Sequence, residues 1–124
     1  MRSVTIRNLD RPELPLISAR YCASFRSRLR GLTFRRQMVP EGGLLLVQGR
    51  DSRLDAAIHM LGVWMDLAVI WINTAGRVVD VRLARPWRPA YLPREPARYV
   101  LELAVDHLDN FRIGDRVQIE PMET

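Results

Sequence analysis

One histidine and two carboxylates are the residues of this chain whose types suit acid–base chemistry. His59 lies in a short apolar stretch, Asp66 precedes a hydrophobic run, and Glu102 interrupts another. An imidazole held by a carboxylate can act as a general base or acid. Nothing in the spacing forces the three together. His59 is also typical of a hydrogen-bonded strand residue, and Glu102 alternates to the face opposite its leucine neighbours, where it would meet solvent.

Residues 84–97 form a second group that could do chemistry. The segment holds four prolines and no strand pattern, so we expect an extended loop. Flat rings and forked cations are interleaved along it, a mixture that suits stacking on a base, a sugar or another aromatic group. These residues are Arg85, Trp87, Arg88, Tyr91 and Arg94. Loops of this length are often functional, but Trp87 and Tyr91 could equally fold back and cover the edge of the core.

Cysteine, metal and cofactor chemistry are not favoured. The one cysteine, Cys22, lies in an apolar strand, where thiols are usually inert, and it cannot form an internal disulfide. The two histidines are far apart in sequence, so no zinc-ligand pattern is present. Gly42-Gly43 precedes a strand and not a helix, unlike a phosphate-binding loop. We predict neither a metal nor a cofactor.

The basic charge consists of arginine alone and is unevenly placed. All 19 basic residues are arginine, against 14 acidic ones. Residues 1–40 hold nine arginines and two acids, a balance of +7, whereas residues 41–124 hold ten arginines and twelve acids, a balance of −2. A basic patch could contact phosphates or an acidic partner. A solvated face with cations at a helix end explains the same residues, so nucleic acid is the less favoured partner.

Length and composition indicate a single domain over residues 1–124. A chain of 124 residues that is 48% hydrophobic can bury a stable core without disulfide cross-links. The amino terminus carries charges where an apolar signal region would lie, and the longest apolar run, residues 67–72, is too short to span a bilayer. Together with the lone cysteine, these features predict a cytoplasmic protein with no membrane partner.

Short strands are the elements that must position the candidate residues. Alternating or continuous hydrophobicity predicts them over residues 4–7, 16–21, 44–47, 58–60, 67–72, 78–83, 99–103 and 116–120. Residues 48–55 are expected to form a polar loop. A turn at residues 73–76 should join its two neighbouring strands as a hairpin, with Val79, Val81 and Leu83 inward and Asp80 and Arg82 in solvent.

Two short helical segments are expected beside the strands. Ser24 is a plausible N-cap for the first, in which Phe25, Leu29 and Leu32 form a buried stripe. Asp106 should cap the second, which runs through Phe111.

These motifs, in this order, resemble the DUF192 family of bacteria and archaea. Arg30-Gly31-Leu32 with Arg35 after it is similar to the family's RGL motif, and residues 41–45 to its glycine entering a hydrophobic strand. The family order continues with residues 58–60, 74–79, the proline segment, 99–103 and 114–115. The resemblance implies a compact, mainly-β, jelly-roll-like sandwich or barrel with one or two short helices. Many members carry a proline before the aspartate that leads into the central strand, and this chain lacks it before Asp66.

Three functions remain open, and the sequence names no ligand. The first is a binding module for a small molecule or a partner segment, which uses residues 84–97 and the adjacent hairpin. Arg30 and Arg35 are further ligand-binding candidates. The second is an enzyme of unknown reaction built on His59, Asp66 and Glu102. The third is an arginine-driven nucleic-acid accessory protein, whose binding should weaken steeply with salt. The first is favoured.

Overall fold

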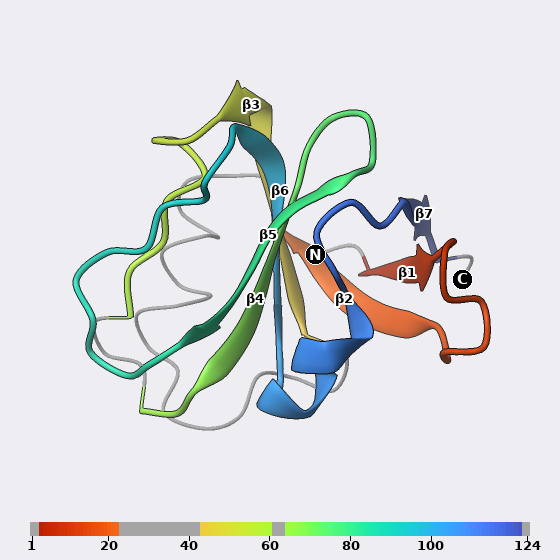
Figure 1. Cartoon of the computed structure of the whole chain (residues 1–124), viewed down its shortest axis with the longest axis horizontal. Coiled ribbons are helices and arrows are strands. Elements are labelled where there is room, and N and C mark those ends of the chain that lie inside the picture. The colour runs from red at the N-terminus through yellow and green to blue at the C-terminus, as the bar shows by residue number, and fades with distance from the viewer. Residues whose placement is uncertain (1–2, 23–42, 61–63, 123–124) are drawn as a thin grey trace.

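Seven strands and one short helix form the part of the chain that the computed structural model describes, residues 3–22, 43–60 and 64–122 (Figure 1). The strands are β1 (Ser3–Asn8), β2 (Ile17–Cys22), β3 (Leu44–Ser52), β4 (Leu67–Ile72), β5 (Val78–Ala84), β6 (Ala97–Leu103) and β7 (Val117–Pro121), and the 3-10 helix is η1 (Val105–Asn110). They form a single sheet in the order β5-β4-β6-β3-β2-β1-β7, in which only β2 and β3 run parallel. The predicted mainly-β fold is confirmed.

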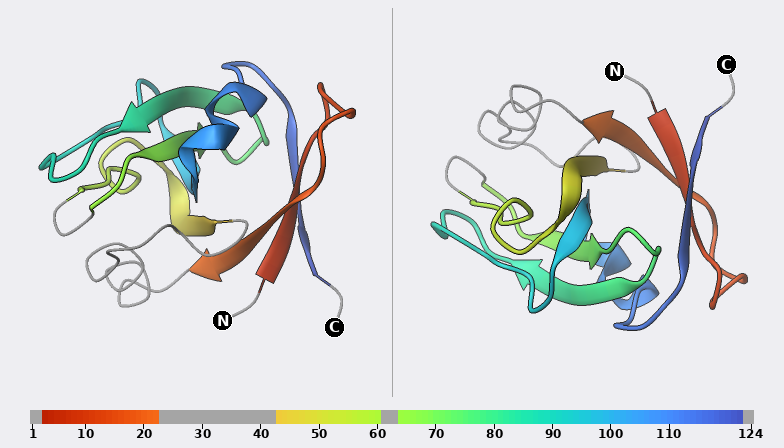
Figure 2. Two further views of the ribbon diagram at one scale, coloured as in Figure 1. Left: turned by 90° about the horizontal axis from the view of Figure 1, so that it is seen from below. Right: turned by 90° about the horizontal axis from the view of Figure 1, so that it is seen from above.

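The sheet curls into a half-barrel (Figure 2). Its two edge strands meet at one end, where the N–H of Val78 donates to the carbonyl of Asp115 at 2.9 Å and the N–H of Gly114 donates to the carbonyl of Val78 at 2.8 Å. A further bond of 2.7 Å joins the Val117 N–H to the Gly76 carbonyl. The single curled sheet is a half-barrel, and the jelly-roll-like arrangement stays a prediction.

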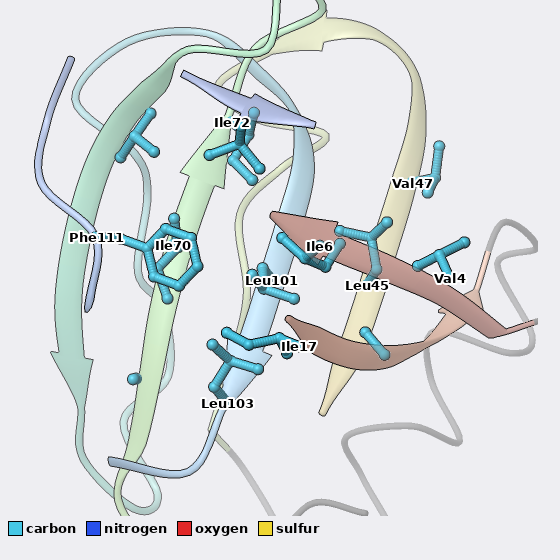
Figure 3. Close-up of a cluster of buried hydrophobic side chains, with 14 residues drawn as sticks. Val4, Ile6, Ile17, Leu45, Val47, Ile70, Ile72, Leu101, Leu103 and Phe111 are labelled. Carbon is cyan, nitrogen blue, oxygen red and sulfur yellow. The ribbon is translucent and has the colours of Figure 1, made fainter. Parts of the chain in front are cut away.

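Burial on both faces explains the continuous apolar run of β4. All six residues of β4 are buried, since β5 and β6 flank the strand and side chains cover both of its faces. The inner face of the curl holds a cluster that draws on all seven strands and on Phe111 (Figure 3). The outer face holds a second cluster, formed by β2–β6 together with Ala56, Ile58 and Met60.

Several predicted boundaries change in the structure. Strand β3 continues to Ser52 instead of ending at Val47, because its backbone keeps pairing with β6 as far as Ala97. The expected strand at residues 58–60 is reduced to one isolated bridge between Ile58 and Tyr91. Helix η1 begins after Ala104 with no side-chain cap, so the predicted cap by Asp106 is wrong. The helix expected after Ser24 lies outside the described residues.

A register shift in the β4–β5 hairpin changes the predicted facing of Val79 and Asp80, whereas Val81 lies on the inner side and Arg82 is exposed, as predicted. The pairing steps from Ile72–Val78 to Trp71–Asp80, which leaves one extra residue on β5. Val79 therefore joins the outer cluster, whereas Val81 packs against the inner one. Asp80, expected in solvent, is only 4% exposed. The alternating pattern did not predict this facing, because the extra residue of a bulge moves every side chain beyond it to the opposite face of the strand.

Gly43 is required where the chain enters β3. Its φ is +107°, and an added Cβ would lie 2.2 Å from the Glu102 carbonyl oxygen and 2.6 Å from a Leu103 side-chain carbon. Replacing Gly43 by alanine should lower the free energy of unfolding by more than about 2 kcal/mol, because a central strand must shift. Gly49→Ala is the matched control, since nothing lies within 4 Å of its added carbon. Urea denaturation measures both, and equal losses would contradict this account.

A surface ion pair ties the β1–β2 turn to the start of β7. Arg116 donates from Nη2 to Asp10 Oδ1 at 2.7 Å, and its backbone N–H donates to Oδ2 at 2.8 Å. These bonds, the side-chain bond first, hold the pKa of Asp10 below its ordinary value of 3.8. The associated stability is present above pH 3.8 and is lost as pH falls through the lower folded pKa.

Arg116→Gln should therefore raise the pKa of Asp10 towards 3.8 without reaching it, because the backbone bond persists. Carboxyl-carbon NMR titration measures this shift directly. An unchanged Asp10 titration in the variant would show that the guanidinium is not the cause.

Candidate functional site

The loop between β5 and β6 is held as an ordered strap along a second loop. This proline strap, residues 85–96, runs beside residues 53–60 (Figure 1). Four backbone hydrogen bonds join them: Ile58 and Tyr91 exchange two, at 2.8 and 3.0 Å, while Met60 donates to Arg88 and accepts from Trp87, each at 2.8 Å. The predicted extended loop is therefore paired backbone, although it forms no regular strand.

Side chains add three further anchors to the proline strap. The Tyr91 hydroxyl accepts a hydrogen bond from the Arg85 N–H at 2.9 Å, and the Arg53 Nε donates to the Pro93 carbonyl at 2.8 Å. Buried Asp80 accepts from the Arg94 N–H at 3.0 Å and from Arg82 Nε at 3.1 Å. Asp80 thus joins β5 to the strap, a role that the sequence pattern did not show because it directed this carboxylate into solvent.

The two aromatic residues of the strap have different surroundings. Tyr91 is half-buried and packs against the outer cluster, as in the core-covering interpretation. Trp87 is 49% exposed and meets Trp64, itself 54% exposed, edge to face with 5.2 Å between ring centroids and planes at 84°. Sequence reasoning did not single out Trp64. Its place just before an apolar strand resembles that of a core residue, and only the fold brings it to Trp87.

Trp87 adopts a backbone conformation that side chains rarely accept. Its φ is 65°, and it is the sole non-glycine residue with positive φ among those described. Holding a bulky residue there costs about 1–3 kcal/mol. The hydrogen bond from its N–H to Met60 helps to enforce the conformation. The indole is therefore kept at the surface at a conformational cost.

Three exposed arginines lie on the same strap as Trp87. Arg85, Arg88 and Arg94 are all exposed, and within the described ranges none of the three lies in an ion pair. Such cations remain available to an anionic group of a ligand. The other two ligand-binding candidates, Arg30 and Arg35, lie outside the described residues, so their position relative to the strap is not assigned.

The three residues of the catalytic hypothesis have unlike surroundings. Glu102 is fully buried in β6, between Leu44 of β3 and Val69 of β4, so its predicted exposure is wrong. Both neighbouring strands cover it because β6 is central. His59 is half-buried between Ile58 and Met60, which both pack into the outer cluster. Successive residues of an extended segment point to opposite sides, so the imidazole is directed away from the outer cluster. Glu102 lies on the side of that cluster, because its partners Leu44 and Val69 belong to it.

Asp66 is half-buried immediately before β4. No described hydrogen bond or ion pair links its carboxylate to either of the other two residues. The catalytic hypothesis built on His59, Asp66 and Glu102 stays a prediction.

Three further observations concern metal ligands, the cysteine and membrane-spanning helices in the described part of the chain. Across residues 3–22, 43–60 and 64–122, no three His, Cys, Asp or Glu side chains are grouped so that they could hold a metal ion. Cys22 is buried and is not part of a disulfide. Among the same residues, no helix has the length and apolar character needed to cross a membrane.

Comparison with solved structures supports the fold. A protein from Sinorhizobium meliloti 1021, which carries the provisional name of a transcription regulator, superposes with a TM-score of 0.79 at 24% identity, over 95% of this chain and 92% of that one. A protein of unknown function from Novosphingobium aromaticivorans gives a TM-score of 0.74 at 20% identity, over 94% and 83%. At these identities the likeness establishes the fold alone.

Sequence relatives are UPF0127 proteins of archaea. The Thermococcus sibiricus protein is 34% identical over 102 residues, which make up 81% of this chain and 64% of that protein. The Thermococcus gammatolerans protein is 42% identical over 79 residues, 64% of this chain and 50% of the relative. The Pyrococcus furiosus protein is 32% identical over 104 residues, 82% and 86%. The chain thus spans only half to two thirds of the length of the two Thermococcus relatives.

The resemblance seen in the sequence is confirmed by the family comparison. Residues 7–119 match the model of one family, described as Uncharacterized ACR. This range includes every described strand except the start of β1 and the end of β7. The chain belongs to the DUF192 family, whose function is unknown.

Proposed function

We propose that this domain is a binding module whose site is the exposed tryptophan pair of Trp64 and Trp87 at the proline strap. The observation that carries the proposal is that both rings stay about half exposed while an anchored and conformationally strained backbone holds one of them against the other. A residue needed only for packing would be buried more deeply, and a free surface loop would relax to an unstrained conformation. Strain of this kind is typical of functional sites.

The chemistry of the site favours a ligand with a flat group and a negative charge. About half of each indole of the pair is exposed and can contact a flat group, and Arg85 and Arg88, close to Trp87 in sequence, supply planar guanidinium groups for a carboxylate or phosphate. A small molecule that bears a ring and an acid fits this description, as does a partner segment with adjacent aromatic and acidic residues. The strap is rigidly attached, so binding costs little ordering of the chain.

The provisional name of the Sinorhizobium protein gives a reason to test nucleic acid as well. Binding dominated by arginine–phosphate contacts would fall steeply as salt rises, whereas stacking on the tryptophans would be far less sensitive to salt. A steep salt dependence that persists without the tryptophan rings would support the nucleic-acid alternative over the proposed site.

Trp87→Gly should change the free energy of unfolding by less than about 1 kcal/mol, because release of the positive-φ strain offsets the lost ring contact. Tyr91→Ala should cost more than about 2 kcal/mol, because this ring packs on the outer cluster. Urea denaturation of both variants tests the difference. A large loss for Trp87→Gly would mean that the indole serves stability and not binding.

A thermal-shift series tests the binding site directly. We expect at least one of adenosine monophosphate, indole-3-acetate and an acidic–aromatic dipeptide to raise the melting temperature in a concentration-dependent way. Trp87→Gly and Trp64→Ser should remove the effect. Ile113→Ser, which deletes another exposed apolar side chain far from the strap in sequence, should retain it. Equal responses in all three variants, or no response of the wild-type protein to any probe, would overturn the proposal.

A further inference from the structure

A cleft lies beside the edge strand β5, between it and residues 108–112. It has a volume of about 470 Å³, within the range of pockets that hold small molecules. Its apolar wall consists of Val81 and Leu83 of β5 with Leu108 and Phe111 from the segment that follows β6. Phe111 is 3% exposed and belongs to the inner cluster, so this wall is fixed by the core (Figure 3). The proline strap does not line the cleft.

The backbone of β5 presents hydrogen-bonding groups beside this wall. The N–H of Val81 donates to the Asp80 carboxylate at 2.9 Å, and so it is directed away from the β4 ladder. In an antiparallel strand, residues two apart direct their backbone groups to the same side. The N–H and C=O of Leu83 therefore lie on the edge that faces away from β4, where no described strand pairs with them.

Arginines give the cleft a positive balance. Arg82 of β5 lines it together with Arg11 and Arg112, and the lining includes one carboxylate, that of Asp109. The Arg82 guanidinium is paired, because its Nε lies 3.1 Å from Asp80 Oδ2. Arg11 is already engaged, because its Nη1 donates to the Asp109 carbonyl and its Nε lies 3.8 Å from Glu13. The Arg112 guanidinium is exposed, and the hydrogen bonds described for this residue are made by its backbone: the N–H donates to Asp115 Oδ2 at 2.9 Å and the carbonyl accepts from the Asp115 N–H at 3.0 Å.

From this geometry we infer a second binding site, specific for an organic anion with an apolar body. The apolar part lies on Leu83, Leu108 and Phe111, and the anionic group pairs with the Arg112 guanidinium, supported by Arg11. Neither feature suffices alone, because an exposed arginine binds a bare anion weakly and a half-open apolar wall gives little specificity. The site is separate from the tryptophan pair, since no residue is shared between them.

Three probes test whether binding requires both a negative charge and an apolar chain. Hexanoate carries both an acid and an apolar chain, hexanamide lacks the charge, and acetate lacks the chain. In a titration followed by amide NMR, we expect hexanoate to bind at least about fivefold more tightly than either of the others. The shifted signals should be those of Leu83, Phe111 and Arg112. Equal affinity of acetate and hexanoate, or shifts confined to the strap, would overturn the inference.

Paired variants separate the cleft from general surface charge. Arg112→Gln should weaken hexanoate binding about fivefold, and Asp109→Asn should strengthen it about twofold, because one removes the attractive charge and the other the repulsive one. Arg20→Gln is the matched control, since it removes an exposed arginine of β2 outside the cleft lining. Trp87→Gly should leave hexanoate binding unchanged, which keeps this test independent of the proposed tryptophan site. Equal weakening by Arg112→Gln and Arg20→Gln would disprove the site.

Discussion

The insertion of β6 between β3 and β4 is the constraint on which the rest of this structure depends. This strand joins the β5–β4 hairpin to the remaining four strands, and it pairs with both neighbours along most of its length. Its position leaves no room for a side chain at Gly43, and it buries Glu102 from both sides. The connection from β5 must cross the outer face of the sheet to reach it. That crossing is the proline strap.

Both faces of the sheet are covered by loop segments, and each of these segments also carries part of a proposed binding site. On the outer face, residues 56–60 and Tyr91 seal the second cluster, and the same backbone pairing carries the exposed Trp87. On the inner face, the segment after β6 closes one end of the half-barrel and inserts Phe111 into the core. Along β5, an edge with which no described strand pairs lies beside an apolar wall.

The two proposed sites therefore differ in physical character although they adjoin the same strand. The tryptophan pair is an exposed, strained platform that suits stacking, and its rigidity comes from hydrogen bonds between two loops. The cleft is a recess whose apolar wall belongs to the core, and its selectivity comes from a balance between arginine and aspartate. Asp80 lies between them, since one carboxylate oxygen accepts from the strap and the other from the edge of β5.

Local patterns in the sequence determined the approximate position of seven strands, the family and the presence of an unusual proline loop. Hydrophobic run length predicted residues 67–72 without error, because a strand buried on both faces needs no alternation. What the sequence could not provide was the facing of polar residues that interrupt strands. Glu102 and Asp80 were both placed in solvent, but a central position and a register shift buried them. The partnership of Trp64 with Trp87 and the cleft beside β5 also came from tertiary structure alone. Each depends on segments that are distant in sequence but close in space. Strand order, which brings these segments together, is a property of the whole sheet.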